Sequence, residues 1–187
     1  MKFVKFIKLI LPIVSVIILS SCLGTEENQY DAWRSENIQW MAQEESRTNP
    51  DGTPYYERIQ APWDFQGYVL MKWHNDRKAT EKNLSPMSNS TIDMKYHGRL
   101  ITGEAFDSSY LRTQPRDSIF RTKLNNTING WIIGVSQMHI GDSCTIVIPY
   151  LQGYGASGSG SGIKPYSNLI FDVKLVDIPG YEKPVAY

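Results

Sequence analysis

The chain has 187 residues, with 19 basic and 19 acidic side chains and a formal net charge of zero. That length suits one compact domain with an extension. The sequence contains no Lys/Arg block or basic stripe that could hold a polyanion, which argues against nucleic acid as a partner.

The N-terminal end has the pattern of an export signal, which we assign to residues 1–22. Three early lysines precede an apolar run over residues 9–19, which is short for a membrane span. The run ends in Leu-Ser-Ser-Cys, so Cys22 stands where bacterial lipoproteins carry the cysteine that is lipidated and becomes the new N-terminus. An ordinary signal peptide or an uncleaved anchor is the alternative.

A lipid on Cys22 would hold the folded part of the chain on a membrane surface. Each buried methylene contributes about 0.8 kcal/mol, and more than one acyl chain makes the anchor stable. We therefore expect an envelope lipoprotein of a Gram-negative bacterium, at the outer membrane, facing the periplasm or the cell surface. The acidic pair Glu26 and Glu27 is similar to the surface-export signals of some such lipoproteins, and it is equally typical of a solvated tether. Cleavage would leave a net charge of about −3, because the signal holds three of the basic residues and no acidic one.

Residues 23–66 are expected to form a polar tether and a helical, partly irregular extension. A helix is predicted over residues 30–45, where mostly apolar side chains recur at near-helical spacing: Trp33, Asn37, Ile38, Trp40 and Met41. The turn-rich run 47–54 should end this helix. These side chains would form a stripe along the helix, which predicts that the helix packs on the domain that follows. A face that binds a partner is the alternative.

Residues 67–180 are expected to form the main domain, and residues 181–187 a tail. One short amphipathic helix is predicted over residues 128–138, and a Gly-rich loop over residues 150–168. Residues 61–65 should be irregular. Many strands around one short helix indicate an α+β fold rather than βαβ repeats. The strands are predicted over 55–60, 68–73, 91–101, 105–109, 120–124, 144–149 and 169–176.

Four short motifs carry the functional signal. They are YHGRLITGEAFDSS from Tyr96, INGW ending at Trp131, GYGASG around Tyr154 and NLIFDVKL around Phe171. Their order and spacing resembles the FKBP-type peptidyl-prolyl isomerases, over roughly residues 90–178. The resemblance implies a curved antiparallel β-sheet wrapped around one short α-helix, here with an N-terminal helical extension.

The resemblance also implies one prolyl pocket between the sheet and the short helix. Trp131 would form its floor, Tyr154 would donate a hydrogen bond to a substrate carbonyl, and the Ile128 N–H would bind another carbonyl. Arg112 would pair with Asp107. The implied catalytic side chains are Tyr96, Phe106, Asp107, Trp131, Tyr154 and Phe171, and the implied substrate-binding residues are Arg112, Thr127, Ile128 and Ile163.

Such a pocket fits the chemistry of an X–Pro bond. The bond rotates across a barrier of about 18–20 kcal/mol, because the planar amide is resonance-stabilised. The twisted transition state has less charge separation, so a dry aromatic pocket favours it over the planar ground state. No cofactor is expected, and His74, His97 and His139 lack metal-ligand spacing. Taken singly, each aromatic would be an equally plausible core residue.

The Gly-rich loop departs from the family pattern. Members usually carry bulkier residues at Ser159 and Gly162, and a proline at Lys164, so we expect weakened binding of macrolide inhibitors. The chain before Phe120 is about two residues longer than in the smallest members. Residues 116–119 are therefore unaligned, which leaves open whether the aromatic usually found there is present.

We expect a lipid-anchored peptidyl-prolyl isomerase that acts on proline-containing polypeptides exported to the envelope. Slow X–Pro isomerisation limits folding over roughly tens to hundreds of seconds, which gives such an enzyme a task. The alternative is a module of the same fold that holds Pro-containing peptides with little turnover, which the altered loop and the extension favour. A purely structural lipoprotein is disfavoured, because Asp107, Trp131 and Tyr154 are all retained.

Overall fold

The computed structural model describes residues 29–180. The predicted export signal with Cys22, the acidic pair that follows it, and the C-terminal tail 181–187 lie outside the described residues. Within the described range, no helix is both long and apolar enough to cross a membrane.

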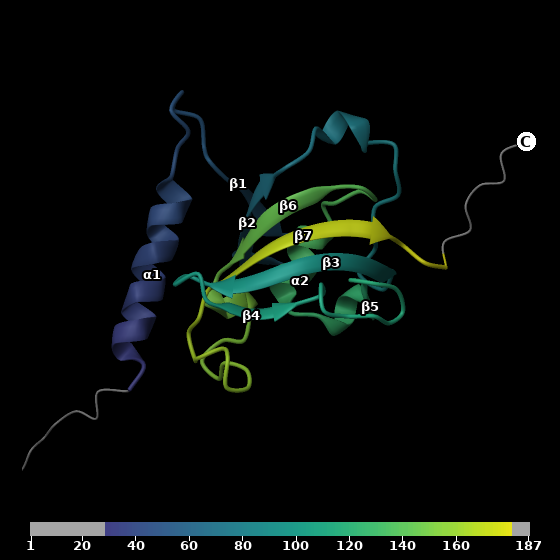
Figure 1. Cartoon of the computed structure of the whole chain (residues 1–187). Coiled ribbons are helices and arrows are strands. Elements are labelled where there is room, and N and C mark those ends of the chain that lie inside the picture. Colours follow the sequence, from purple (N-terminus) through teal and green to yellow (C-terminus); the bar gives the residue numbers. More distant parts are fainter. Residues whose placement is uncertain (1–28, 181–187) are drawn as a thin grey trace, which may run out of the picture.

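Seven strands form a single curved sheet in which all paired neighbours are antiparallel (Figure 1). They are β1 (Glu57–Ala61), β2 (Asp64–Trp73), β3 (Thr91–Leu100), β4 (Ala105–Ser108), β5 (Phe120–Lys123), β6 (Ser143–Ile148) and β7 (Leu169–Asp177). The sheet order is β1-β2-β6-β7-β3-β4, and β5 also pairs with β3. The predicted α+β class with an antiparallel sheet is confirmed.

The two α-helices lie on opposite faces of the sheet, because successive strand side chains point to opposite faces. Helix α2 packs into the main core, and it spans Asn129–Val135. Its partners on the sheet include Met71, Ile146 and Phe171. Helix α1 (Asp31–Ser46) covers the residues that alternate with these, namely Leu70, Val147 and Ile170.

Helix α2 approaches the sheet closely through two glycines. A Cβ atom on Gly130 would lie 2.3 Å from Ile148 Cγ2, and one on Gly134 would lie 2.9 Å from Ile146 Cδ1. Any larger residue at Gly130 would therefore push the helix away from the sheet. This close approach sets the depth of the adjacent Trp131, which is buried.

The predicted packing of α1 on the domain is confirmed. Met41 is buried in a small cluster on the outer face of the sheet, with Trp40 packed against its edge. Asn37 is fully buried, although it is polar. Ile38 is 48% exposed, so it does not belong to the packed stripe.

Strand β3 pairs with β7 along one edge, and along its other edge it has two successive partners. Its first half pairs with β5, where Met94 lies opposite Phe120, and its second half pairs with β4, where Gly98 lies opposite Asp107. Tyr96 lies between these two pairings and belongs to the α2 side of the sheet. The change of partner therefore brings β4, β5 and the start of α2 around one side chain.

The beginning of the sheet differs from the prediction. The segment 61–65 is irregular only in part: a two-residue turn joins β1 to β2 and Ala61 pairs with Asp64, while the strand register shifts between Gln60 and Ala61. Strand β2 therefore begins four residues earlier than expected, and β1 begins two residues later. The expected domain start at residue 67 falls inside β2.

Helix α2 is shorter than the predicted 128–138. The N–H groups of Gln137 and Met138 donate to carbonyls three residues back, at 3.0 Å in each case, so the chain tightens beyond Val135. Met138 remains fully buried, which explains why the apolar pattern continued past the helix end. The structure also contains three single 3₁₀ turns, at Arg77–Ala79, Leu124–Asn126 and Tyr150–Gln152.

Candidate functional site

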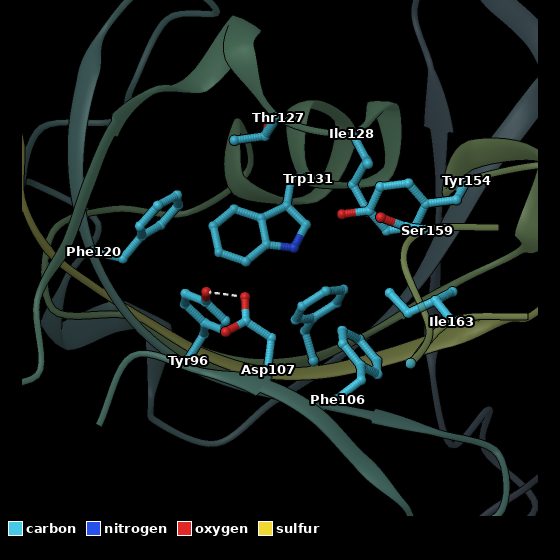
Figure 2. A pocket seen from close by; sticks show the side chains of 12 residues that line it. Tyr96, Phe106, Asp107, Phe120, Thr127, Ile128, Trp131, Tyr154, Ser159 and Ile163 are labelled. Atoms are coloured by element: carbon cyan, nitrogen blue, oxygen red, sulfur yellow. Dashed lines mark hydrogen bonds between the residues drawn. The ribbon is translucent and has the colours of Figure 1, made fainter. Parts of the chain in front are cut away.

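A cavity of about 300 Å³ lies between the sheet and the N-terminal end of α2 (Figure 2). Strands β3, β4, β5 and β7 supply one part of its wall, and α2 and the loop after β6 supply the rest. Twelve residues line it: Tyr96, Phe106, Asp107, Phe120, Thr127, Ile128, Trp131, Tyr154, Ser159, Gly162, Ile163 and Phe171.

The centre of the cavity wall is the indole of Trp131, in the first turn of α2. Its ring meets Tyr96 at 5.2 Å between centroids, Phe171 at 5.3 Å and Phe120 at 6.1 Å, with interplanar angles of 85–87°. Phe106 extends the set by an edge contact with Phe171. Edge-to-face pairs of this kind add about 0.5–1.5 kcal/mol each beyond area burial, so the rings hold one another in place.

A polar pair forms part of the wall beside these rings. The Tyr96 hydroxyl donates to Asp107 Oδ2 at 2.5 Å, and the Ser108 N–H donates to Asp107 Oδ1 at 2.7 Å. Burial, and then the bond to Asp107, raise the pKa of Tyr96 to about 12. The Tyr96 hydroxyl therefore stays protonated near neutral pH and orients the carboxylate.

Arg112 does not occupy the predicted position. No ion pair within residues 29–180 joins Arg112 to Asp107, and Arg112 does not line the cavity. Its Nη2 instead donates to the Tyr96 hydroxyl at 3.4 Å, and its guanidinium lies 4.9 Å from the centre of the Phe120 ring. Arg112 thus supports the aromatic wall from outside the cavity.

Three hydrogen-bond donors at the cavity have no partner among the described residues. The Trp131 Nε1–H is fully buried and unpaired. The Ile128 N–H precedes the first turn of α2 and makes no internal bond. The Tyr154 hydroxyl also lacks a protein partner and sits on a side chain that is 38% exposed. Burial, and then the charge of Asp107, raise the pKa of Tyr154, so its hydroxyl remains a donor.

The loop between β6 and β7 closes one side of the cavity, where Gly162 lies next to Phe106 of β4. Ser159 and Ile163 form an isolated antiparallel bridge, with N–H to O distances of 2.8 and 3.1 Å. Gly158, with φ of +67°, makes this turn possible, since a Cβ atom there would lie 2.3 Å from the Ile163 oxygen. A Cβ atom on Gly162 would reach only the Phe106 Cβ, at 3.7 Å, so space remains on this side.

The structure brings nine of the ten implied pocket residues to the cavity, and Arg112 is the exception. Phe120 is a lining residue that the motifs did not identify. A signal was available, because Phe120 is the sole aromatic residue between Tyr110 and Trp131 in the sequence. Its role depends on the pairing of β5 with β3, which short motifs do not reveal.

The remaining chemically reactive side chains lie elsewhere. Cys144 is fully buried on β6, and burial raises the pKa of its thiol, so it is not a candidate nucleophile. Among residues 29–180, no three His, Cys, Asp or Glu side chains gather in a way that could hold a metal ion.

A sequence model of the family described as FKBP-type peptidyl-prolyl cis-trans isomerase matches residues 82–176. "FK506-binding protein 4" of Dictyostelium discoideum is 44% identical over 92 residues, which is 49% of this chain and 24% of that protein. The "FKBP-type 22 kDa peptidyl-prolyl cis-trans isomerase" of Escherichia coli is 36% identical over 93 residues, or 50% of this chain and 43% of that protein.

A solved structure agrees over a longer stretch. The crystal structure of a peptidyl-prolyl cis-trans isomerase from Pseudomonas syringae pv. tomato superposes with a TM-score of 0.60 and 26% identity, covering 80% of this chain and 95% of that one. The chain spans less than half the length of the two curated relatives named above. The similarity to them is thus confined to one domain.

Proposed function

The chain belongs to the family of FKBP-type peptidyl-prolyl cis-trans isomerases, and from this premise we propose that it accelerates rotation about X–Pro bonds. The observation that carries the proposal is the aromatic cavity around Trp131, whose buried N–H has no partner within residues 29–180. A proline ring fits such a cavity, because it is compact and apolar and has no N–H of its own to satisfy.

Catalysis would follow from differential binding. The planar X–Pro amide is stabilised by resonance and by hydration of its polarised carbonyl, and both are reduced when the bond twists. Entry into a dry aromatic cavity removes the hydration, which disfavours the planar form more than the twisted one. Rings that already hold one another need no rearrangement when the substrate binds.

The unpaired donors would hold the substrate backbone while the amide turns. The Ile128 N–H and the Tyr154 hydroxyl would each bind a carbonyl next to the proline, and the Trp131 indole N–H offers a third, deeper donor. Asp107 is held by Tyr96 and presents its carboxylate to the cavity. No proton transfer is assigned to Asp107, since twisting an amide moves no proton.

The place of action and the substrates are part of the proposal. The signal pattern ending at Cys22 supports a lipid-anchored protein of the cell envelope. Its substrates would be exported polypeptides whose folding waits for X–Pro isomerisation. Macrolide inhibitors would bind with reduced affinity, because Gly162 leaves the loop side of the cavity open.

The proposal is tested by measuring catalysed exchange. The soluble chain from residue 23 onward is mixed with a series of X–Pro tetrapeptides, and cis–trans exchange rates are read from NMR exchange spectra. We expect acceleration at enzyme concentrations far below that of the peptide, with apolar residues preferred before proline. A folded protein that accelerates no peptide in the series would contradict the proposal.

A second candidate is a peptide-binding module with little turnover. The observation that favours it is the open loop side, where Ser159 and Gly162 replace bulkier groups and leave fewer contacts to a bound chain. The same spectra separate the two functions. A binding module would shift the peptide resonances on titration while leaving the exchange rate unchanged.

A further inference from the structure

A buried polar contact joins helix α1 to the pocket loop, which we define as residues 150–168. Asn37 on α1 is fully buried, and Asn168 at the end of the loop is 1% exposed. The Asn168 N–H donates to Asn37 Oδ1 at 2.7 Å, and Asn168 Nδ2 donates to the Asn37 carbonyl at 2.6 Å. Two bonds, both donated by Asn168, thus fix the end of the pocket loop against the helix.

The same contact reaches the start of the pocket loop. The Tyr150 N–H donates to Asn168 Oδ1 at 2.9 Å, so one side chain connects the two ends of the loop and α1. The Asn37 amide also donates to the Trp33 carbonyl at 2.9 Å, one turn earlier in the helix. The side-chain oxygen and nitrogen atoms of Asn37 and Asn168 therefore all take part in one hydrogen-bond network. Each of the two NH₂ groups uses one of its two N–H bonds.

A second contact lies one turn earlier on α1. The Trp33 indole N–H donates to Ser167 Oγ at 3.0 Å, and Ser167 is 2% exposed. Ser167 Oγ in turn donates to the Lys164 carbonyl at 2.8 Å, and the Lys164 ammonium lies 5.3 Å from the centre of the Trp33 ring. Trp33 therefore touches the stretch that immediately follows the cavity residue Ile163.

A third contact lies where two parts of the pocket loop are hydrogen-bonded to each other. The Tyr166 N–H donates to the Gly155 carbonyl at 2.8 Å, next to Tyr154 of the cavity. The Tyr166 ring meets the Tyr150 ring at 5.6 Å, and the guanidinium of Arg34 lies 4.9 Å from its centre. Arg34 again belongs to α1 and is adjacent to Trp33, so the first two turns of this helix contact the pocket loop between Lys164 and Asn168.

From these contacts we propose that α1 sets the conformation of the pocket loop, with Trp33 and Asn37 as positioning residues for substrate binding. Neither residue lines the cavity, whereas Tyr154, Ser159, Gly162 and Ile163 on the loop do. Helix α1 lies outside the range 82–176 that the family's sequence model matches. Its effect on catalysis rests on the proposed isomerase function.

The expected kinetic signature follows from population arithmetic. If α1 releases the loop, only a fraction of molecules has a complete cavity before substrate arrives, and apparent affinity falls by that fraction. Once substrate is bound the cavity is complete, so turnover of the bound complex changes little. Loss of the contacts should therefore raise KM and leave kcat nearly unchanged.

The test compares two graded variants with a matched control on the same helix. Trp33→Phe removes the donor to Ser167 and keeps a ring, and Asn37→Ala removes the amide that holds Asn168. Met41→Ala is the control, because the Met41 side chain packs on Leu70, Val147 and Ile170 of the sheet and takes no part in the hydrogen bonds from α1 to the pocket loop. Each variant is measured for kcat, KM, melting temperature and amide hydrogen exchange across the pocket loop.

We expect Trp33→Phe and Asn37→Ala to raise KM by about three- to tenfold, the equivalent of one net hydrogen bond, with kcat within about twofold of the parent. Exchange of loop amides should accelerate, while exchange in β3 and β7 stays at the parent rate. Met41→Ala should lower the melting temperature and leave KM and loop exchange unchanged. Adding Ser167→Ala to Trp33→Phe should add only the effect of losing the Ser167–Lys164 bond, because the bond from the indole is already gone.

Two outcomes would overturn the inference. The first is a loop whose exchange is the same in the parent, Trp33→Phe and Asn37→Ala. The second is a Met41→Ala protein that matches these variants in loop exchange, which would show general loosening instead of positioning. If the parent accelerates no peptide, the proposed function fails, and loop exchange still decides this inference on its own.

Discussion

At the scale of single residues, the cavity separates side chains that hold structure from those that offer bonds. Trp131 packs against rings on three strands and is 4% exposed, whereas Tyr154 is 38% exposed and has no protein partner for its hydroxyl. Substitutions at these two positions should therefore have different effects on folding and on catalysis.

Trp131→Ala should cost both stability and activity. Truncation of a buried aromatic residue destabilises by about 3–5 kcal/mol, and it would also remove the cavity floor.

Tyr154→Phe removes one hydroxyl, worth about 0.5–1.5 kcal/mol, so kcat/KM should fall about tenfold or less with little change in melting temperature. Thermal melts and exchange rates measured together check both. If Tyr154→Phe unfolds the domain while Trp131→Ala stays active, the site is elsewhere.

The backbone N–H of Ile128 can be tested by a substitution that removes it. Ile128 has φ of −65° and ψ of 153°, and its N–H makes no internal bond, so proline fits there. Thr127 before it is extended, with φ of −107° and ψ of 175°, as a residue preceding proline should be. Ile128→Pro should therefore fold normally and lose about three- to tenfold in kcat/KM.

The matched control is Ile128→Val, which keeps the N–H and the branched side chain. We expect its kcat/KM to stay within about twofold of the parent, and the two variants to melt within about 4 °C of each other. Equal activity of Ile128→Pro and Ile128→Val would show that this N–H does not hold the substrate.

At the scale of elements, Asp93 fastens the chain between β4 and β5 to β3. Its carboxylate is fully buried and accepts bonds from Arg116 at 2.7 Å and from Arg121 at 2.6 and 2.8 Å. Burial alone would raise the pKa of Asp93, but the two guanidinium groups outweigh it and lower that pKa. The neighbouring Phe120 is thereby held at the cavity.

The lowered pKa predicts a loss of stability in acid. A carboxylate with a folded-state pKa below the unfolded value near 4 stabilises the fold above that pH, and the contribution disappears as pH falls through the folded-state pKa. The free energy of unfolding in urea should therefore decline below about pH 4. Asp93→Asn should lower it by about 1.5–3 kcal/mol at pH 7 and reduce the acid slope.

The remaining slope in Asp93→Asn should come from Asp142 and Asp172, since their pKa values are lowered by hydrogen bonds despite burial. An Asp93→Asn protein with the full acid slope of the parent would contradict this account.

The elements also show how far the sequence predicts the fold. Apolar runs and alternating patterns located the strands β3, β6 and β7 to within one residue, because each is buried on the α2 face and flanked by turn residues. The β1–β2 hairpin was missed at Pro62 and Trp63, since proline there suggested irregular chain. The motifs placed most of the cavity residues, but the Arg112 contact and the role of Phe120 depend on the course of residues 109–119, which no local pattern encodes.

At the scale of the whole molecule, the two faces of one sheet have different tasks. The α2 face holds the cavity, and the opposite face receives α1, whose first turns contact the pocket loop (Figure 1). An anchored protein of this design would present its cavity loop close to the point of attachment, because α1 contacts that loop from its first turns.

The proposed anchor is tested by Cys22→Ala. Without the thiol no acyl chain can be attached, so the protein should move from the detergent phase to the aqueous phase on Triton X-114 partition, with isomerase activity of the soluble fraction retained. A variant that partitions like the parent would show that residues 9–19 remain as an uncleaved anchor.

The central claim is that proline binds on Trp131, and the five tryptophans offer a direct measurement of it. The indole N–H signals of a ¹⁵N-labelled protein are followed as an X–Pro peptide is added. The Trp131 signal should move most, because its N–H is unpaired at the cavity, while those of Trp33 and Trp73, which are bonded to Ser167 and Glu57, should move little. A stationary Trp131 signal beside a shifting Trp40 or Trp63 signal would place the peptide elsewhere and contradict the account.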